Sequence, residues 1–199
     1  MRFILKRFLF LLTHFCCLST LLVHFPAVSA EYTFSTWNLE WLTNNPSKRI
    51  EPSQREASDF KALNKVFSKV PNPSLHIMSF QEVDSKEALE HVTGDGYQYF
   101  FSERSRSKHR DLQFEGINQY TGFAVSKGIN VQNPDDINLM PSQFNKLRFA
   151  TYIVVDIPKK KSIHLLSVHL KSGCFAARKN TNSCRALAKQ GKSLNGWIK

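Results

Sequence analysis

The stretch SLHIMSFQEV, residues 74–83, decides how this chain is interpreted. It is short and mostly apolar, which is typical of a strand buried within a sheet. It ends in two polar residues, Gln81 and Glu82, just before a stretch with a helical pattern. Glu82 therefore either caps the helix that follows or belongs to a polar site at the end of a buried strand.

Upstream of this stretch, the sequence predicts one strand and one helix. YTFSTWNL, residues 32–39, alternates between apolar and polar residues and indicates a strand that ends near Asn38. Between Ser53 and Val70, apolar residues recur every three or four positions, as on one face of a helix. We expect Ser53 to be the N-cap, with Glu56 three residues later completing a capping box.

Downstream, strand patterns dominate. ERSRSKHRDLQFEG, residues 103–116, has no periodicity and is predicted to be an exposed loop, and residues 130–145 a second loop. Gly122 lies inside a predicted strand, where glycine permits close approach of a neighbouring backbone. The three lysines of PKKK suit a solvated hairpin tip. The predicted elements are strands at 97–102, 120–126, 147–157 and 162–170 and helices at 85–92 and 184–198.

The order of these elements defines a fold class. Strands and helices are mixed, hairpin-like strand pairs dominate the second half, and no repeat or low-complexity segment interrupts them. This pattern predicts an α/β (α+β) protein, in which sheet layers are covered by helices.

The first thirty residues have the layout of a secretory signal peptide. Three basic residues precede a long uncharged apolar run, and AVSA, residues 27–30, places small residues before a cut after Ala30. We expect cleavage, secretion or periplasmic localisation and no membrane span in the mature chain, residues 31–199. An uncleaved anchor is the alternative, because the run from Phe8 to Ala30 is long enough to cross a bilayer.

Charge and cysteine content suggest partners and a compartment. The formal net charge of +11 falls to +8 when the leader removes three basic residues and no acids. A basic exported protein favours polyanions such as nucleic acid or anionic lipid headgroups, although many soluble proteins are basic for no functional reason. Cys174 and Cys184 remain in the mature chain and are predicted to form a disulfide; two free thiols or a metal site are the alternatives.

Three predicted strands end in polar residues. Asn38 follows the first, Glu82 the second and His169 the last. In layered sheet proteins, sites gather at strand ends and in the loops after them. Mg²⁺ prefers oxygen ligands, often one or two carboxylates with water and substrate phosphate, and a nearby histidine can handle a proton. The set suits a metal-dependent phosphodiesterase, although each residue taken singly also fits an ordinary capping or packing role.

Five motifs, taken in order, resemble the endonuclease/exonuclease/phosphatase family of deoxyribonuclease-like metal-dependent phosphohydrolases. They cover nearly all of the mature chain. They are TWNLEWL at 36–42, SFQEVDS at 79–85, QYTGFAVSKG at 119–128, LRFATYIVVDI at 147–157 and LLSVHLKSGCF at 165–175.

The resemblance implies roles for individual residues. Asn38 and Glu82 would lie at a site for Mg²⁺, with Mn²⁺ or Ca²⁺ as alternatives, and His169 would be the active-site histidine. Tyr120 and Arg148 would contact the substrate phosphate; strand-edge packing is the alternative for both. The implied function is hydrolysis of phosphate esters, with nucleic acid or another phosphate ester as substrate and no stable protein partner.

The resemblance also implies an incomplete domain. Family members carry an Asp-x-Asn pair and a terminal Asp-His pair, and neither follows HLKSG in this chain. We therefore expect a partial four-layer α/β/β/α sandwich of mixed sheets that lacks its last strands, with impaired catalysis. The alternatives are a phospholipid or sugar-phosphate hydrolase of the same family and a non-catalytic remnant.

Overall fold

The computed structural model describes residues 30–140, 146–175 and 180–199. The predicted signal peptide, residues 1–30, lies outside the described residues apart from Ala30, so its cleavage and the export of the chain stay predictions. The chain divides into two units, Met1–Ala30 and Glu31–Lys199, and every helix and strand of the described residues belongs to the second unit. Within the described ranges, no helix is both long and apolar enough to cross a bilayer.

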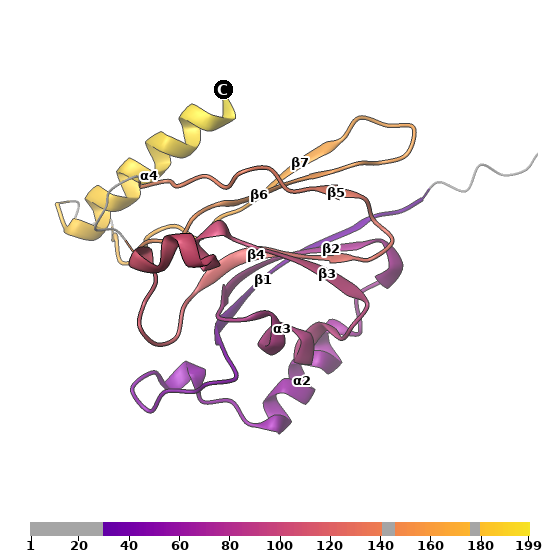
Figure 1. Cartoon of the computed structure of the whole chain (residues 1–199), viewed down its shortest axis with the longest axis horizontal. Coiled ribbons are helices and arrows are strands. Elements are labelled where there is room, and N and C mark those ends of the chain that lie inside the picture. Colours follow the sequence, from indigo (N-terminus) through magenta and orange to yellow (C-terminus); the bar gives the residue numbers. More distant parts are fainter. Residues whose placement is uncertain (1–29, 141–145, 176–179) are drawn as a thin grey trace, which may run out of the picture. The chain divides into compact units, whose positions relative to one another are not determined.

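The first sheet is mixed and has the strand order β1-β2-β4-β3 (Figure 1). Its strands are β1 (Thr33–Leu42), β2 (His76–Val83), β4 (Tyr120–Ser126) and β3 (Tyr97–Phe101). β1 pairs with β2 in parallel, whereas β4 pairs antiparallel with both β2 and β3. The buried strand predicted from SLHIMSFQEV therefore lies inside the sheet, between β1 and β4.

The second sheet contains β5 (Val131–Gln132), β6 (Thr151–Val155) and β7 (Ile163–Ser167) in that order. Its pairings are all antiparallel among the described strands. The mixed pairing is therefore found in the first sheet, and the second is antiparallel over its described strands. The physical reason is the connection: β6 and β7 are joined by a short hairpin around the lysines of PKKK, and such a turn can join only antiparallel strands.

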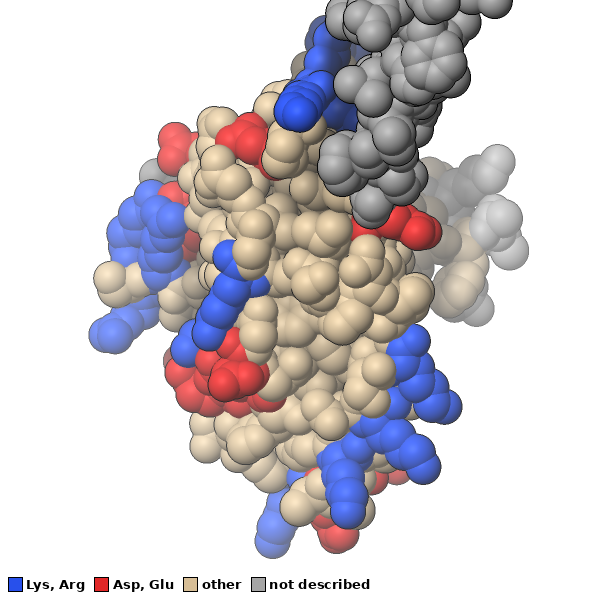
Figure 2. Space-filling view, turned by 90° about the vertical axis from the view of Figure 1, so that its right-hand side faces the viewer, with Lys and Arg blue, Asp and Glu red and all other residues tan. Residues whose placement is uncertain are grey.

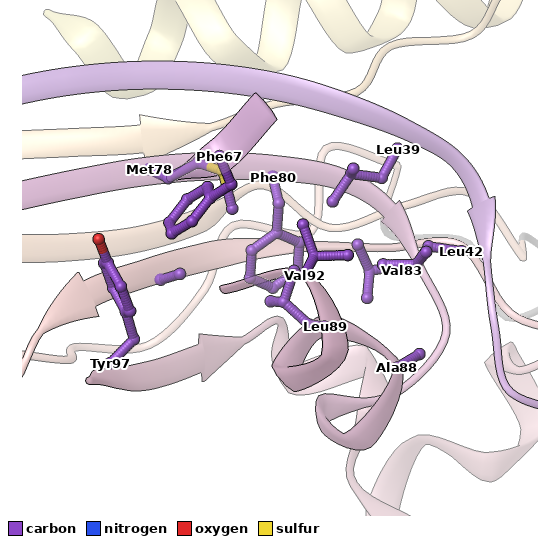
Figure 3. Close-up of a cluster of buried hydrophobic side chains, with 11 residues drawn as sticks. Leu39, Leu42, Phe67, Met78, Phe80, Val83, Ala88, Leu89, Val92 and Tyr97 are labelled. Carbon is purple, nitrogen blue, oxygen red and sulfur yellow. The ribbon is translucent and has the colours of Figure 1, made fainter. Parts of the chain in front are cut away.

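Helices cover the outer faces of the two sheets. α2 (Ala57–Phe67) and α3 (Lys86–Thr93) pack on the first sheet, and Figure 3 shows the apolar side chains that fill this interface. α4 (Asn182–Ile198) lies beyond the second sheet, where Trp197 packs edge-on against Tyr152 of β6 with ring centroids 5.0 Å apart. The layer order is helix, sheet, sheet, helix (Figure 1), which confirms the predicted fold class.

The contact between the two sheets is apolar at one end and polar at the other. Ile77 of β2 lies in an apolar cluster with residues of β4 and β6. Further along the same face of β2, the Ser79 hydroxyl donates to the hydroxyl of Ser167 on β7 at 2.8 Å. Gln81 donates to Ser79 at 2.8 Å and to Ser167 at 3.3 Å. A hydroxyl and amide network therefore joins the sheets near the end of β2.

The predicted helix cap at Ser53 was wrong. Ser53 is fully buried in a short 3₁₀ helix, Glu51–Ser53, and its hydroxyl donates to the Ile50 carbonyl at 2.6 Å. α2 begins four residues later, with Glu56 as N-cap in a capping box with Asp59. The apolar period itself begins at Ala57, so the cap lies directly before it at Glu56, whose carboxylate accepts from the N3 backbone N–H.

The predicted exposed loop at residues 103–116 was also wrong in part. It contains two 3₁₀ helices, Glu103–Ser105 and Ser107–Leu112. Arg104 is completely buried, because backbone carbonyls and a side-chain amide from residues 112–119 accept hydrogen bonds from its guanidinium group. Two further short 3₁₀ helices precede these, Glu51–Ser53 and Pro73–Leu75. The predicted loop at 130–145 contains β5, and its last five residues lie outside the described part of the chain.

Candidate active site

A β-bulge positions Glu82 at the end of β2. β2 and β4 pair at Phe80 opposite Gly122 and next at Val83 opposite Tyr120. Between these two pairs β2 advances by three residues and β4 by two, so β2 contains one extra residue. Phe80 and Val83 are both fully buried in the cluster on the helix side. Glu82 is the extra residue, held at a left-handed φ of 60°. Bulges re-aim side chains and are common beside functional sites.

A second irregularity lies beside it in β1. The parallel pairing holds to Asn38 opposite Gln81 and resumes at Leu42. Between these positions, Glu40 and Trp41 have φ values of 45° and 59°. Left-handed backbone costs on the order of 1–3 kcal/mol for a residue other than glycine, and such strain gathers at functional sites. The Asn38 side-chain oxygen accepts a hydrogen bond from the Glu40 backbone N–H at 2.9 Å, which stabilises this turn.

The Glu82 carboxylate is the centre of the cluster. Asn38 Nδ2 donates to Glu82 Oε1 at 3.2 Å, and His169 Nε2 lies 3.5 Å from the same oxygen. Gln119 Nε2 donates to Glu82 Oε2. The structure therefore brings together the three residues that were predicted from the strand ends. They come from β1, from β2 and from the segment after β7.

His169 contributes the cluster's one imidazole. The pKa of His169 is lowered, first by burial and then by the nearby Arg148 guanidinium, although Glu82 acts in the opposite direction. Its Nδ1 atom is buried and has no hydrogen-bond partner among the described residues. The Nε2 atom is therefore the nitrogen that faces the carboxylate, and an imidazole placed in this way can exchange a proton with a group bound there.

Gln119 links the carboxylate to Arg148. It is 4% exposed, its amide nitrogen contacts Glu82, and its amide oxygen accepts a hydrogen bond from Arg148. Burial lowers the pKa of Arg148, while Glu82 raises it. Sequence reasoning gave Gln119 no role, although it is the first residue of the motif QYTGFAVSKG, because a glutamine before a strand has no periodic signal. The structure makes it the bridge between two charged side chains.

Tyr120 has a different environment from the other predicted residues. It is 6% exposed, and its ring packs against Phe101 and lies 4.9 Å from the Arg104 guanidinium carbon. Burial raises its pKa, and Arg104 partly offsets this effect. Burial lowers the pKa of Arg104 to about 10. These contacts favour the packing role that was the alternative for Tyr120.

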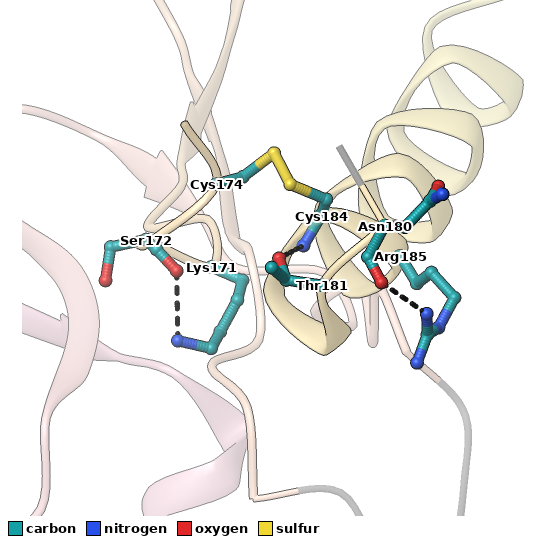
Figure 4. Close-up of a disulfide and its surroundings, with 7 residues drawn as sticks. All are labelled: Lys171, Ser172, Cys174, Asn180, Thr181, Cys184 and Arg185. Carbon is teal, nitrogen blue, oxygen red and sulfur yellow. Dashed lines mark hydrogen bonds between the residues drawn. A yellow bond between two sulfur atoms is a disulfide. The ribbon is translucent and has the colours of Figure 1, made fainter. Parts of the chain in front are cut away.

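The predicted disulfide between Cys174 and Cys184 is present, with Cα atoms 4.7 Å apart (Figure 4). It ties the segment after β7 to the first turn of α4, where the Thr181 hydroxyl caps the helix by accepting from the Cys184 N–H. Further along α4, the buried Gln190 accepts a hydrogen bond from the Lys171 backbone N–H at 2.8 Å. α4 is thus attached to the chain two residues after His169.

The donor set fits one hard cation held by one carboxylate. Within the described ranges, no group of three or more His, Cys, Asp or Glu side chains could enclose a metal. A carboxylate offers about four lone-pair directions; the described hydrogen bonds of Glu82 use two of them, and His169 Nε2 lies 3.5 Å from Oε1. Mg²⁺ commonly binds through one or two carboxylates and keeps water and substrate phosphate as its other ligands.

Comparisons with known proteins find likenesses among solved structures. No protein-family model matches the chain, and no curated protein sequence matches it. Among solved structures, TDP2 from Caenorhabditis elegans is 21% identical with a TM-score of 0.49, over 82% of this chain and 41% of that one. A truncated form is 19% identical with a TM-score of 0.43, over 74% and 47%. The chain spans less than half of these proteins, and likenesses with TM-scores below 0.5 support no functional assignment.

Proposed function

We propose that this protein is a Mg²⁺-dependent phosphodiesterase that hydrolyses phosphate esters, with nucleic acid as its substrate. The observation that carries the proposal is the contact of Glu82 with both Asn38 and His169, three polar side chains delivered by three separate strand ends. Two adjoining irregularities in β1 and β2 create that meeting point. The left-handed backbone at Glu40, Trp41 and Glu82 also supports the proposal, because such strain gathers at functional sites.

Each side chain has a distinct task in this proposal. Glu82 binds the cation, and Asn38 orients the carboxylate through its amide N–H. A bound Mg²⁺ would neutralise charge on the phosphoryl oxygens. Arg148 supplies a guanidinium fork suited to a phosphate, and Gln119 holds it beside the carboxylate. His169, whose Nε2 faces the Glu82 carboxylate, exchanges a proton or a hydrogen bond with the substrate phosphate.

The charge of the chain supports a polyanionic substrate. Lysine and arginine exceed aspartate and glutamate by 11 in the full chain. On the face drawn in Figure 2, basic side chains stand in separate groups with acidic ones between them. The net charge therefore attracts nucleic acid to the molecule as a whole, whereas positioning of the phosphate depends on Arg148 and the cation.

We also propose that the protein is exported. Disulfides persist in oxidising compartments such as the periplasm or the extracellular space and are rare in the cytosol. The Cys174–Cys184 bond, together with the predicted leader, supports a secreted or periplasmic location.

The activity test uses the full chain with plasmid DNA and with RNA, each in Mg²⁺ and in EDTA. We expect weak cleavage, in Mg²⁺ only, and its loss in Glu82→Gln and His169→Ala. Glu87→Gln is the matched control, because Glu87 is an exposed carboxylate in the first turn of α3. Circular dichroism shows whether each variant is folded. Cleavage that persists in EDTA, or in folded Glu82→Gln, contradicts the proposal.

A further inference from the structure

A half-exposed aromatic ring lies on the loop that leads into β4. The Phe114 side chain is 44% exposed, although it is a large apolar group. It lines a surface depression of about 410 Å³ together with Arg110, Asp111, Gln113, Glu115 and Lys146. An exposed aromatic ring among charged side chains is a poor packing residue, but it is the usual platform on which proteins stack an unpaired base.

The Phe114 ring is held in place by its backbone. The Phe114 N–H donates to the Asn118 side-chain oxygen at 3.0 Å, and the Asn118 amide donates back to the Phe114 carbonyl at 3.2 Å. Asn118 is buried, and its own N–H donates to Asp84 at 2.6 Å. These bonds fix the loop before any ligand binds, which limits the entropy lost on binding.

Two cations lie near the ring, one buried and one exposed. The Arg104 guanidinium carbon is 5.9 Å from the ring centroid and is completely buried. The Lys146 ammonium group is 5.8 Å from the centroid, and Lys146 is exposed. A flexible exposed lysine can leave the ring for a phosphate at small cost. The carboxylates of Asp111 and Glu115 also line the depression, and they would repel a phosphate from their side of it.

The ring is connected to the candidate active site. Arg104 lies 4.9 Å from the Tyr120 ring centroid as well as near Phe114, so one buried guanidinium is in contact with both rings. Asn118, which fixes Phe114, is followed directly by Gln119, which contacts the Glu82 carboxylate. Phe114 is therefore joined to the residues around Glu82 through Arg104 and through the segment from Asn118 to Gln119.

We propose that Phe114 and the depression beside it form a subsite for one unpaired base of a single-stranded nucleic acid, with Lys146 binding an adjoining phosphate. This inference rests on the proposed nuclease function, because it places the base beside the phosphate that is cleaved. Stacking tolerates any base, since every base has a π-face. Bases of an intact duplex are already stacked and cannot use the ring.

The binding test uses a fluorescein-labelled dT decamer and the same strand in a duplex, in EDTA so that no cleavage occurs. For the full chain, we expect Phe114→Ala to weaken decamer binding by roughly 5- to 150-fold, the range for loss of one stacked base. Phe114→Trp should retain the affinity. Lys146→Gln should reduce the slope of log affinity against log salt by about 0.7, the value for one single-strand phosphate.

The matched control is Phe34→Ala, because Phe34 is 47% exposed near the start of β1, away from Asn38. It should bind the decamer as the unchanged chain does. Equal affinity for Phe114→Ala and Phe34→Ala overturns the subsite, as does an equal loss of duplex binding in Phe114→Ala. Mg²⁺-dependent cleavage combined with binding that is independent of Phe114 overturns the subsite alone. Absence of cleavage in Mg²⁺ overturns the nuclease proposal instead.

Discussion

Gly122 should be one of the least replaceable residues of the first sheet. A Cβ atom added there would lie 2.3 Å from Cζ of Phe80 and 2.4 Å from the carbonyl oxygen of Phe100. Phe80 is fully buried and packs against Phe101 with ring centroids 4.8 Å apart, so its ring has no free space to enter. The carbonyl belongs to β3 and moves only if the strand moves. The change Gly122→Ala must therefore displace a strand.

The expected loss follows from this overpacking. Extra methyl or methylene groups in a well-packed core cost about 1–3 kcal/mol, and occasionally more. We expect about 3 kcal/mol for Gly122→Ala, because one of the two neighbouring groups is backbone. For a chain of this length, that corresponds to a fall of roughly 6–12 °C in Tm. Thermal unfolding of the full chain followed by circular dichroism measures it.

Gly96→Ala is the matched control. A Cβ atom at Gly96 meets no atom within 4 Å, and the backbone there does not need a left-handed φ. Replacing a glycine at such a position stabilises a protein by about 0.4–1 kcal/mol, because the unfolded chain loses freedom. The two variants carry the same chemical change and should shift Tm in opposite directions. Equal Tm values would refute the reasoning.

Three further predictions concern the bridge, a buried carboxyl and the disulfide. Gln119→Leu removes the amide that Glu82 and Arg148 share, although Glu82 keeps its hydrogen bond from Asn38, and should lower the free energy of unfolding by about 1–3 kcal/mol; an unchanged urea midpoint contradicts this. Burial raises the pKa of Asp136 from 3.8 to about 6, so its contribution is complete below pH 4 and is lost as the pH rises through 6. Between pH 4 and pH 7, the free energy of unfolding should therefore fall by about 2 kcal/mol more in the unchanged chain than in Asp136→Asn; equal pH slopes would exclude this. Replacing Cys174 and Cys184 together by serine should cost about 3 kcal/mol, and mass spectrometry that finds both thiols free would contradict the bond itself.

The sequence alone predicted the strands that have a continuous apolar pattern and the polar residues that lie at strand ends. Apolar runs predicted β2 and β4, because buried strands need continuous apolar character. The meeting of Asn38 with Glu82 could be anticipated, because both lie at strand ends. β1 and β2 proved to be parallel neighbours, whose carboxyl ends meet at one edge. The bulge that turns Glu82 out of the core could not be predicted, because it depends on which residue of β4 lies opposite.

Most of the residues whose burial or role the sequence did not predict form contacts with residues that are distant in sequence. Arg104 was assigned to an exposed loop, yet it is buried because carbonyl groups from residues 112 and 119 accept its protons. Gln119 has no pattern of its own, and its role exists only because Glu82 and Arg148 lie on either side. Such positions depend on tertiary contacts, which local periodicity does not encode.

The polar network between the two sheets sets the alignment of the active site. Glu82 belongs to the first sheet and His169 lies just after the second, so their separation of 3.5 Å changes if one layer slides over the other. Apolar surfaces tolerate sliding, whereas the hydroxyl and amide groups of Ser79, Gln81 and Ser167 are satisfied together at one offset only. A chain with the same apolar core but alanine at these three positions would lose the polar contacts nearest the site that fix this offset, and His169 would no longer be held at one distance from Glu82.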